Sequence, residues 1–209
     1  DLDALGACIA LSSAVQQLGK QAYIVLDKSK TMAEPLYKRA EALDAPCYIV
    51  SGEEVMPFID SDTLLIIADV HRPSFLDCPE LYNKCNNVVV IDHHRKSVDY
   101  IENSVLFYHM PNSSSASEMV TEIAQYVDAK PVLDKFSSLA LFSGIMLDTR
   151  NFILRAGVRT FEAAAYLRRL GAETVAVREM FGYSIDAYRH RALIVSSAEL
   201  MDGCAVSIC

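Results

Sequence analysis

Thr63-Leu-Leu-Ile-Ile-Ala-Asp69 and Asn87-Val-Val-Val-Ile-Asp92 are two short apolar runs, and each ends in a carboxylate. Continuous apolar strands of this length, separated by segments with helical patterning, are typical of a parallel sheet that is buried on both faces. Two more short apolar segments, 23–26 and 47–50, precede them with a helical stretch between. The sequence therefore predicts an α/β protein, in which a parallel β-sheet carries helices on both faces.

Local signals mark where the helices begin and end. Ser51 and Ser115 are each followed three residues later by a glutamate, which is the capping-box pattern of a helix start. Asp134 is placed to cap a long apolar helix, and glycines 19 and 171 are placed to end two others. The predicted helices cover residues 4–18, 31–43, 52 onward, 116–127, 135–147 and 159–170, with more helix to about residue 200.

The predicted elements alternate between strands and helices in the first half of the chain and become mostly helical after it, and this change divides the chain into three parts. Residues 1–130 are predicted to be an α/β core that lacks its N-terminal strand. Residues 131–200 are predicted to be the helical part and a connection. Residues 201–209, with a single strand over 204–209, are expected to start a truncated further domain.

Composition excludes several classes of protein. The chain has 209 residues, of which 52% are hydrophobic, so it can bury a sizeable core and is not disordered. No apolar run reaches the roughly 18 residues of a membrane span, so we expect a soluble, cytoplasmic domain. A net charge of −8 argues against a broad basic face for long nucleic acid. The six cysteines show no CxxC spacing, and we expect reduced, mostly buried thiols.

Carboxylates and histidines gather where a parallel sheet binds its ligands, at the C-terminal ends of the strands. A carboxylate that ends a buried apolar segment is costly unless something pairs with it. Oxygen and imidazole donors without a thiol suit Mn²⁺ or Mg²⁺ better than structural zinc. Asp69, Asp92, His93 and His94 are placed at strand ends, Asp1 and Asp3 precede the first helix, and Asp148 ends an apolar helix. We expect all of them at the ligand-binding edge. The other histidines, His71, His109 and His190, are expected to be surface or packing residues.

These residues carry a family resemblance. Val90-Ile-Asp-His-His-Arg95 is similar to the motif that names the DHH phosphoesterases, and the other carboxylates follow that family's order. The stretches 68–73, 113–118 and 144–152 resemble the GdpP-type cyclic-di-AMP phosphodiesterases more than RecJ exonucleases or family II pyrophosphatases. The resemblance covers essentially the whole chain.

The resemblance implies two divalent ions, Mn²⁺ first, with Mg²⁺ or Co²⁺ as alternatives. Asp1 and Asp69 would hold one ion, together with a histidine that the family carries four residues before Asp1. Asp3, Asp69, His93 and Asp148 would hold the other. His94 and Arg95 would face the phosphate, and Asp92 would orient a ligand histidine. The weaker candidates for phosphate contact are Ser114, Ser115 and Arg150.

The implied reaction is hydrolysis of cyclic-di-AMP to pApA by a hydroxide that bridges two metal ions roughly 3.5–4 Å apart. An oligoribonuclease or pAp phosphatase of the same superfamily is the first alternative, and a pyrophosphatase is less favoured. A nucleotide-binding regulatory module without catalysis is the alternative from another class. The partner is expected to be a cyclic dinucleotide, the parent protein to be membrane-anchored, and a homodimer is left open.

Overall fold

The computed structural model describes residues 1–127, 133–182 and 185–208. The chain divides into two compact units, Asp1–Val177 and Arg178–Cys209. All the predicted site residues lie in the first unit. In the described part of the chain, no helix is both long and apolar enough to cross a bilayer.

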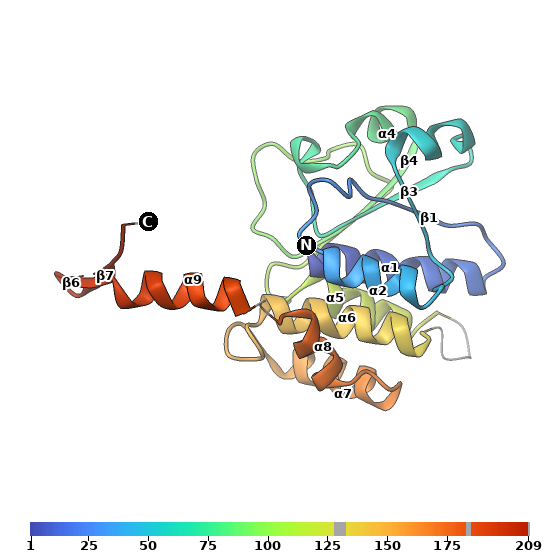
Figure 1. Ribbon diagram of the computed structural model, residues 1–209. Coiled ribbons are helices and arrows are strands. Elements are labelled where there is room, and N and C mark those ends of the chain that lie inside the picture. The colour runs from blue at the N-terminus through green and yellow to red at the C-terminus, as the bar shows by residue number, and fades with distance from the viewer. Residues whose placement is uncertain (128–132, 183–184, 209) are drawn as a thin grey trace. The chain divides into compact units, whose positions relative to one another are not determined.

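The first unit alternates strands and helices, as the apolar runs predict (Figure 1). Its strands are β1 (Tyr23–Val25), β2 (Tyr48–Val50), β3 (Leu64–Ala68), β4 (Asn87–Asp92) and β5 (Leu106–His109). Its helices are α1 (Leu2–Gln17), α2 (Glu34–Ala42), α3 (Gly52–Val55), α4 (Pro79–Lys84), α5 (Ala116–Ala124), α6 (Lys135–Asp148) and α7 (Val158–Arg169). Two 3-10 turns, η1 (Met56–Phe58) and η2 (Pro73–Phe75), follow α3 and precede α4, and α8 (Thr174–Met180) spans the boundary between the units.

The strands are parallel, as predicted, but they form two sheets. β3, β4 and β5 make a three-stranded sheet in that order, and β1 pairs with β2 in a separate two-stranded sheet. A cavity of about 880 Å³ is lined by residues of α1, β1 and β3, among others. The sequence analysis did not predict β5, which extends the sheet beside β4.

The core packs around the central strand and behind it. Val88 and Val90 of β4 are buried and pack with Ile67 of β3 and with Ile101. On the helical side α6 packs against α1, α5 and α7, and Figure 1 shows α1 and α6 lying side by side. A Cβ atom at Gly6 of α1 would overlap the carbonyl oxygen of Ala140, so glycine permits this close approach.

Two of the three predicted helix starts have the predicted caps. Ser51 and Glu54 form the reciprocal capping box, and Asp134 accepts a hydrogen bond from the Ser137 amide. At α5, Ser115 accepts from the Glu118 amide, but the Glu118 carboxylate does not reach back to Ser115. The capping box predicted there is therefore only half formed, because the Glu118 carboxylate accepts hydrogen bonds from the hydroxyls of Ser113, Ser114 and Thr160 instead.

The second unit contains α9 (Ile185–Ser196) and an antiparallel hairpin, β6 (Glu199–Met201) with β7 (Cys204–Val206). The helix ends earlier than residue 200, and a hairpin stands where one strand was predicted. Asp202 and Gly203 both have positive φ values, 48° and 80°, which suit a two-residue hairpin turn. Cys209 lies outside the described residues.

The five cysteines in the described part of the chain are free, and they are less buried than predicted. Among the five described cysteines only Cys85 is buried, and Cys204 is exposed. Cys8, Cys47 and Cys78 are partly exposed.

Candidate metal centre

The ends of β3 and β4 bring two site segments together. Their parallel register pairs Ala68 with Ile91, and the Asp69 amide donates a 2.8 Å hydrogen bond to the Ile91 carbonyl. Asp69 then turns with φ of 65°, a left-handed conformation that aspartate tolerates better than most residues. This turn leaves the Asp69 carboxylate beside the His93 ring, which directly follows β4.

His93 is the centre of the candidate site. Its Nε2 atom lies 3.2 Å from Asp69 Oδ1, 3.2 Å from Asp148 Oδ2 and 3.7 Å from Asp3 Oδ2. Asp3 comes from the first turn of α1 and Asp148 from the last residue of α6. Four predicted ligands from four segments of the chain are thus brought together.

The cluster lacks hydrogen bonds that a buried polar group normally makes. Asp69 Oδ1 and both ring nitrogens of His93 are buried and make no hydrogen bond of good geometry among the described residues. Among these residues Nε2 and Asp69 Oδ1 have only ion-pair contacts of 3.2–3.7 Å, and Nδ1 has none. Such orphaned groups cost about 1–3 kcal/mol each when nothing compensates them. A cation among these atoms would compensate them, so the donor set fits a divalent metal ion.

Two overlapping groups have metal-ligand spacing. Asp3, His93 and Asp148 form one, and Asp69, His93 and His94 form the other, each with ligand atoms within 4.8 Å of one another. Oxygen and imidazole donors are those that suit Mn²⁺ or Mg²⁺. His94, predicted to face the phosphate, is therefore also placed where it could hold a cation.

The electrostatics show an excess of negative charge. Burial, followed by the neighbouring charges of Asp69 and Asp148, raises the pKa of Asp3 from 3.8 to about 8. Burial by itself would lower the pKa of His93, but Asp148, Asp69 and Asp3 outweigh it and raise the pKa to about 10. The cluster therefore favours added positive charge, which a metal ion also supplies.

Asp3 is held firmly by the start of α5. Its Oδ2 accepts a 2.7 Å hydrogen bond from the Ala116 amide and its Oδ1 a 2.8 Å bond from the Ser117 amide. On its other side α6 passes closely: a Cβ at Gly144 would lie 2.6 Å from Asp3 Oδ1 and 2.8 Å from its Cα. Glycine is thus required where α6 passes this predicted ligand.

Asp1 is placed differently from the other predicted ligands. It is exposed and caps α1, with Oδ1 accepting from the amides of Asp3 and Ala4 at 2.9 and 3.1 Å. It belongs to neither of the two groups with metal-ligand spacing. Its role as a ligand stays a prediction.

Asp92 is fully buried and orients a histidine, though not the one at the centre. Its Oδ1 accepts from His94 Nδ1 at 2.8 Å and from the His94 amide at 3.1 Å, and its Oδ2 faces His71. Burial would raise the pKa of Asp92, but these bonds outweigh it and hold the pKa well below its usual range. Asp92 is therefore an anion that fixes the exposed His94 ring.

The predicted phosphate contacts are scattered. The hydroxyl of buried Ser114 donates to Glu118 Oε2 at 2.5 Å, and that of Ser115 caps α5, so both already have partners. Arg95 is exposed after His94, and Arg150 is exposed after α6 with φ of 46°. Contact of these four residues with a substrate stays a prediction.

Two histidines expected to be surface or packing residues lie beside this site. His71 is buried and hydrogen-bonded to Asp92, and His109 Nε2 donates to the His94 carbonyl at 2.6 Å. A signal was present in the sequence, because His71 follows a strand-ending carboxylate by two residues. His109 ends β5, the strand that the sequence analysis did not predict. His190 lies exposed on α9, as expected.

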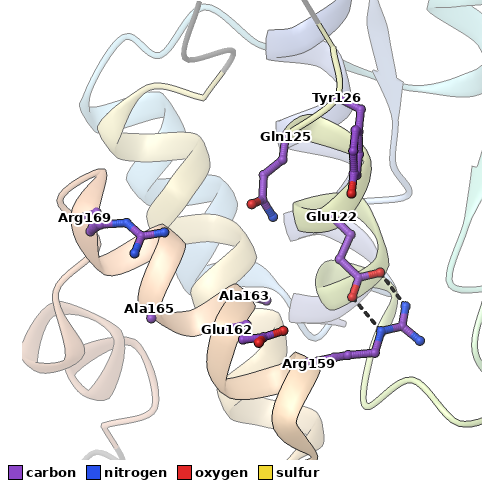
Figure 2. Close-up of a pocket in the computed structure, with 8 residues that line it drawn as sticks. All are labelled: Glu122, Gln125, Tyr126, Arg159, Glu162, Ala163, Ala165 and Arg169. Atoms are coloured by element: carbon purple, nitrogen blue, oxygen red, sulfur yellow. Dashed lines mark hydrogen bonds and ion pairs between the residues drawn. The ribbon is translucent and has the colours of Figure 1, made fainter.

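A second hollow, of about 520 Å³, is lined by side chains from the end of α5 and from α7 (Figure 2). There Arg159 and Glu122 point toward one another and form a two-bond ion pair, with Nε to Oε1 at 2.7 Å. None of the predicted site residues lines this hollow. The charges of Arg159 and Glu122 satisfy each other, in contrast to the cluster around His93.

Comparison with known proteins places this geometry in a family. Residues 1–145 match the DHH family, N-terminal domain. Cyclic-di-AMP phosphodiesterase GdpP of Geobacillus thermodenitrificans is 40% identical over 206 residues, which are 96% of this chain and 31% of that protein. GdpP of Bacillus subtilis is 37% identical over 205 residues, and PdeA of Listeria monocytogenes, also named a cyclic-di-AMP phosphodiesterase, is 35% identical over 211. These cover 96% and 99% of this chain, and 31% and 32% of the relatives.

The chain thus spans about a third of the length of the curated relatives it matches. Among solved structures, an exopolyphosphatase-related protein from Bacteroides fragilis has the same fold, with a TM-score of 0.76 at 18% identity. The match covers 96% of this chain and 59% of that one. By its family match over residues 1–145, this chain belongs to the DHH family.

Proposed function

We propose that this chain is the hydrolytic domain of a phosphodiesterase that opens cyclic-di-AMP to the linear dinucleotide pApA. The observation that carries the proposal is the buried cluster around His93, whose Nε2 lies 3.2–3.7 Å from three carboxylates. Relatives at 35–40% identity bear the name of this activity. We propose Mn²⁺ as the metal, in a two-metal site.

Charge explains why metal ions are needed. The chain carries a net charge of −8 and its candidate site holds three carboxylates, so a phosphodiester would be repelled. Bound divalent ions would supply positive charge to the phosphate and lower the pKa of a water to make a nucleophile. Asp3, Asp69, His93 and Asp148 would hold one ion, and Asp1 and Asp69 would hold the other.

The remaining polar groups would bind and orient the substrate. His94 donates a hydrogen bond from Nδ1 to Asp92, so Nε2 is the ring atom left to face a phosphate oxygen, to which it would donate in the imidazolium form. Arg95 and Arg150 are exposed cations that follow the two segments carrying His93 and Asp148. We propose that they contact the phosphate. Ser114 and Ser115 are the weaker candidates for that contact, and their hydrogen bonds also stabilise the loop before α5.

The direct test is hydrolysis of cyclic-di-AMP with and without Mn²⁺, with products resolved by chromatography. We expect Mn²⁺-dependent formation of pApA, lost in Asp69→Asn. Asp44→Asn is the matched control, because Asp44 also has a positive φ, 48°, but is exposed and far from the predicted ligands in sequence. Unchanged turnover in Asp69→Asn, or turnover that does not need a divalent ion, would contradict the proposal.

The same assay separates the alternatives. Faster turnover of pApA, pAp or a short oligoribonucleotide would favour an oligoribonuclease or pAp phosphatase. Calorimetric binding of cyclic-di-AMP by metal-free protein, without turnover when Mn²⁺ is added, would favour a regulatory module. A homodimer and a membrane-anchored parent protein whose catalytic part is cytoplasmic are further proposals, to be tested on the longer protein.

A further inference from the structure

Three histidines, His71, His94 and His109, and the carboxylate of Asp92 form the hydrogen bonds that fix the loop after β4. The two carboxylate oxygens of Asp92 have different partners. Oδ1 accepts hydrogen bonds from the ring and the amide of His94, and Oδ2 pairs with the ring of His71. His109 holds the same loop through the His94 carbonyl. Of these groups only His94 has an exposed ring, with 54% of the side chain accessible.

The hydrogen bonds of His71 define its protonation. Its Nε2 accepts a 2.9 Å hydrogen bond from the Ser97 amide, so this nitrogen carries no proton. Its Nδ1 must then carry the proton and donate to Asp92 Oδ2. The main chain is fixed as well, because the His71 carbonyl accepts from the Ile101 amide at 2.8 Å.

Burial makes this arrangement rigid. His71 is 4% exposed and Asp92 is fully buried, so water does not compete for their hydrogen bond. With Oδ2 used by His71, the carboxylate can turn only Oδ1 toward His94. The direction of the His94 ring therefore depends on a side chain that lies on a different loop, two residues after Asp69.

We propose that His71 is a positioning residue, which fixes Asp92 and through it directs the imidazole of His94 toward the substrate phosphate. This inference rests on the proposed function, since it gives His94 a phosphate to face. Among the described residues, His71 makes no hydrogen bond or ion pair with Asp3, Asp69, His93 or Asp148 (the His93 cluster), so its loss should leave metal binding by these four residues intact. Residues that orient a catalytic or ligand histidine typically contribute 10–100-fold.

Two variants separate positioning from simple packing. In His71→Asn the amide nitrogen can stand where Nδ1 stands and keep the bond to Asp92. In His71→Gln the amide can stand where Nε2 stands, keeping the bond from Ser97 but losing that to Asp92. If His71 only packs or anchors the loop, the glutamine variant should perform at least as well as the asparagine variant.

The experiment measures kcat and KM for cyclic-di-AMP, Mn²⁺ affinity, and the imidazole ¹⁵N NMR spectrum of each variant. We expect kcat of His71→Asn to stay within about 3-fold of wild type and kcat of His71→Gln to fall about 10–100-fold. Mn²⁺ affinity should hold in both, and the Nδ1–H signal of His94 should persist only in wild type and His71→Asn. Equal kcat values in the two variants, or an unchanged His94 signal in His71→Gln, would overturn the inference.

The NMR comparison also keeps this inference apart from the proposed function. A wild-type chain that does not hydrolyse cyclic-di-AMP would refute the proposed function. The His94 signal in the two variants would still decide whether His71 positions that ring.

Discussion

The described part of the first unit contains one buried carboxylate surrounded by hydroxyls and one cluster of several carboxylates, and the two are satisfied in opposite ways. In the Glu118 cluster (Ser113, Ser114, Glu118 and Thr160), Glu118 accepts hydrogen bonds at 2.5–3.3 Å from three hydroxyls and an amide. In the His93 cluster (Asp3, Asp69, His93 and Asp148), a carboxylate oxygen and both imidazole nitrogens make no hydrogen bond of good geometry among the described residues.

The pKa directions follow from this difference. Burial would raise the pKa of Glu118, but hydrogen bonds from Ser114, Thr160 and Ser113 outweigh it and lower the pKa. Asp3 is buried among like charges, and its pKa is raised. Burial alone therefore does not mark a site: the Glu118 cluster is completed by the fold, and the His93 cluster needs a cation.

The largest effect should come from removing the shared carboxylate of the His93 cluster. Asp69→Ala should lower cyclic-di-AMP hydrolysis by more than about 100-fold. Asp92→Asn should lower it by about 10–100-fold, because Asp92 acts by orienting His94 and is not itself a predicted ligand. Initial rates at saturating Mn²⁺ measure both. Equal and mild losses in the two variants would contradict the assignment of Asp69 as a ligand.

The Glu118 cluster should respond in stability. Glu118→Gln should lower the free energy of unfolding by about 2–3 kcal/mol, because an amide cannot accept all four hydrogen bonds. Glu122→Gln, one turn later in α5 and in a partly exposed ion pair, should cost less than about 1 kcal/mol. Urea unfolding at pH 7 measures both.

The pH dependence gives this prediction a second readout. Because the folded-state pKa of Glu118 lies below its ordinary value of 4.5, its stabilisation is present above that pH and is lost as the pH falls below it. Glu118→Gln should reduce this loss on the acid side. If the free energy of unfolding of Glu118→Gln fell with decreasing pH as much as that of wild type, Glu118 would not be the stabilised anion.

A smaller effect on stability and on Mn²⁺ binding should follow from adding a methyl group where α6 packs against Asp3. Gly144→Ala would place a Cβ 2.6 Å from Asp3 Oδ1, and we expect a loss of about 1–3 kcal/mol with weaker Mn²⁺ binding. Gly157→Ala is the control, because a Cβ there meets nothing within 4 Å. Thermal unfolding with and without Mn²⁺ tests the pair, and equal behaviour would argue against close packing of α6 on Asp3.

The smallest effect concerns Ser115, the cap of α5. Ser115→Ala should cost about 1 kcal/mol of stability, because the cap of α5 is lost. Since Ser115 is only a weaker candidate for phosphate contact, KM for cyclic-di-AMP should change by less than about 2-fold. A raised KM with unchanged stability would instead support substrate contact. Urea unfolding and steady-state kinetics on the same preparation distinguish the two outcomes.

Strong local signals made much of the fold predictable. β4 has the predicted bounds, and Ser51 and Asp134 cap the predicted helices. The apolar runs also placed Asp69 and His93 at one sheet edge. These features depend on periodicity and on caps, which short stretches of sequence encode directly.

The missed features depend on tertiary contacts. β5 is short and only partly buried, so its pairing with β4 rather than its own composition defines it. The pairing of Asp92 with His71 joins residues 21 positions apart. The Glu118 carboxylate accepts a hydrogen bond from Thr160, 42 positions away, instead of completing the predicted capping box. Sequence spacing singled out Asp92 and Glu118, but it could not predict that His71 and Thr160 are their hydrogen-bond partners.

Counting bound Mn²⁺ tests the central claim most directly. Equilibrium dialysis followed by elemental analysis should find close to two Mn²⁺ ions per chain in wild type and in Glu118→Gln, as a two-metal site requires. Asp69→Asn should lose most of this binding. Wild-type protein without bound Mn²⁺, or Asp69→Asn with the full complement, would contradict the account of the His93 cluster as a metal centre.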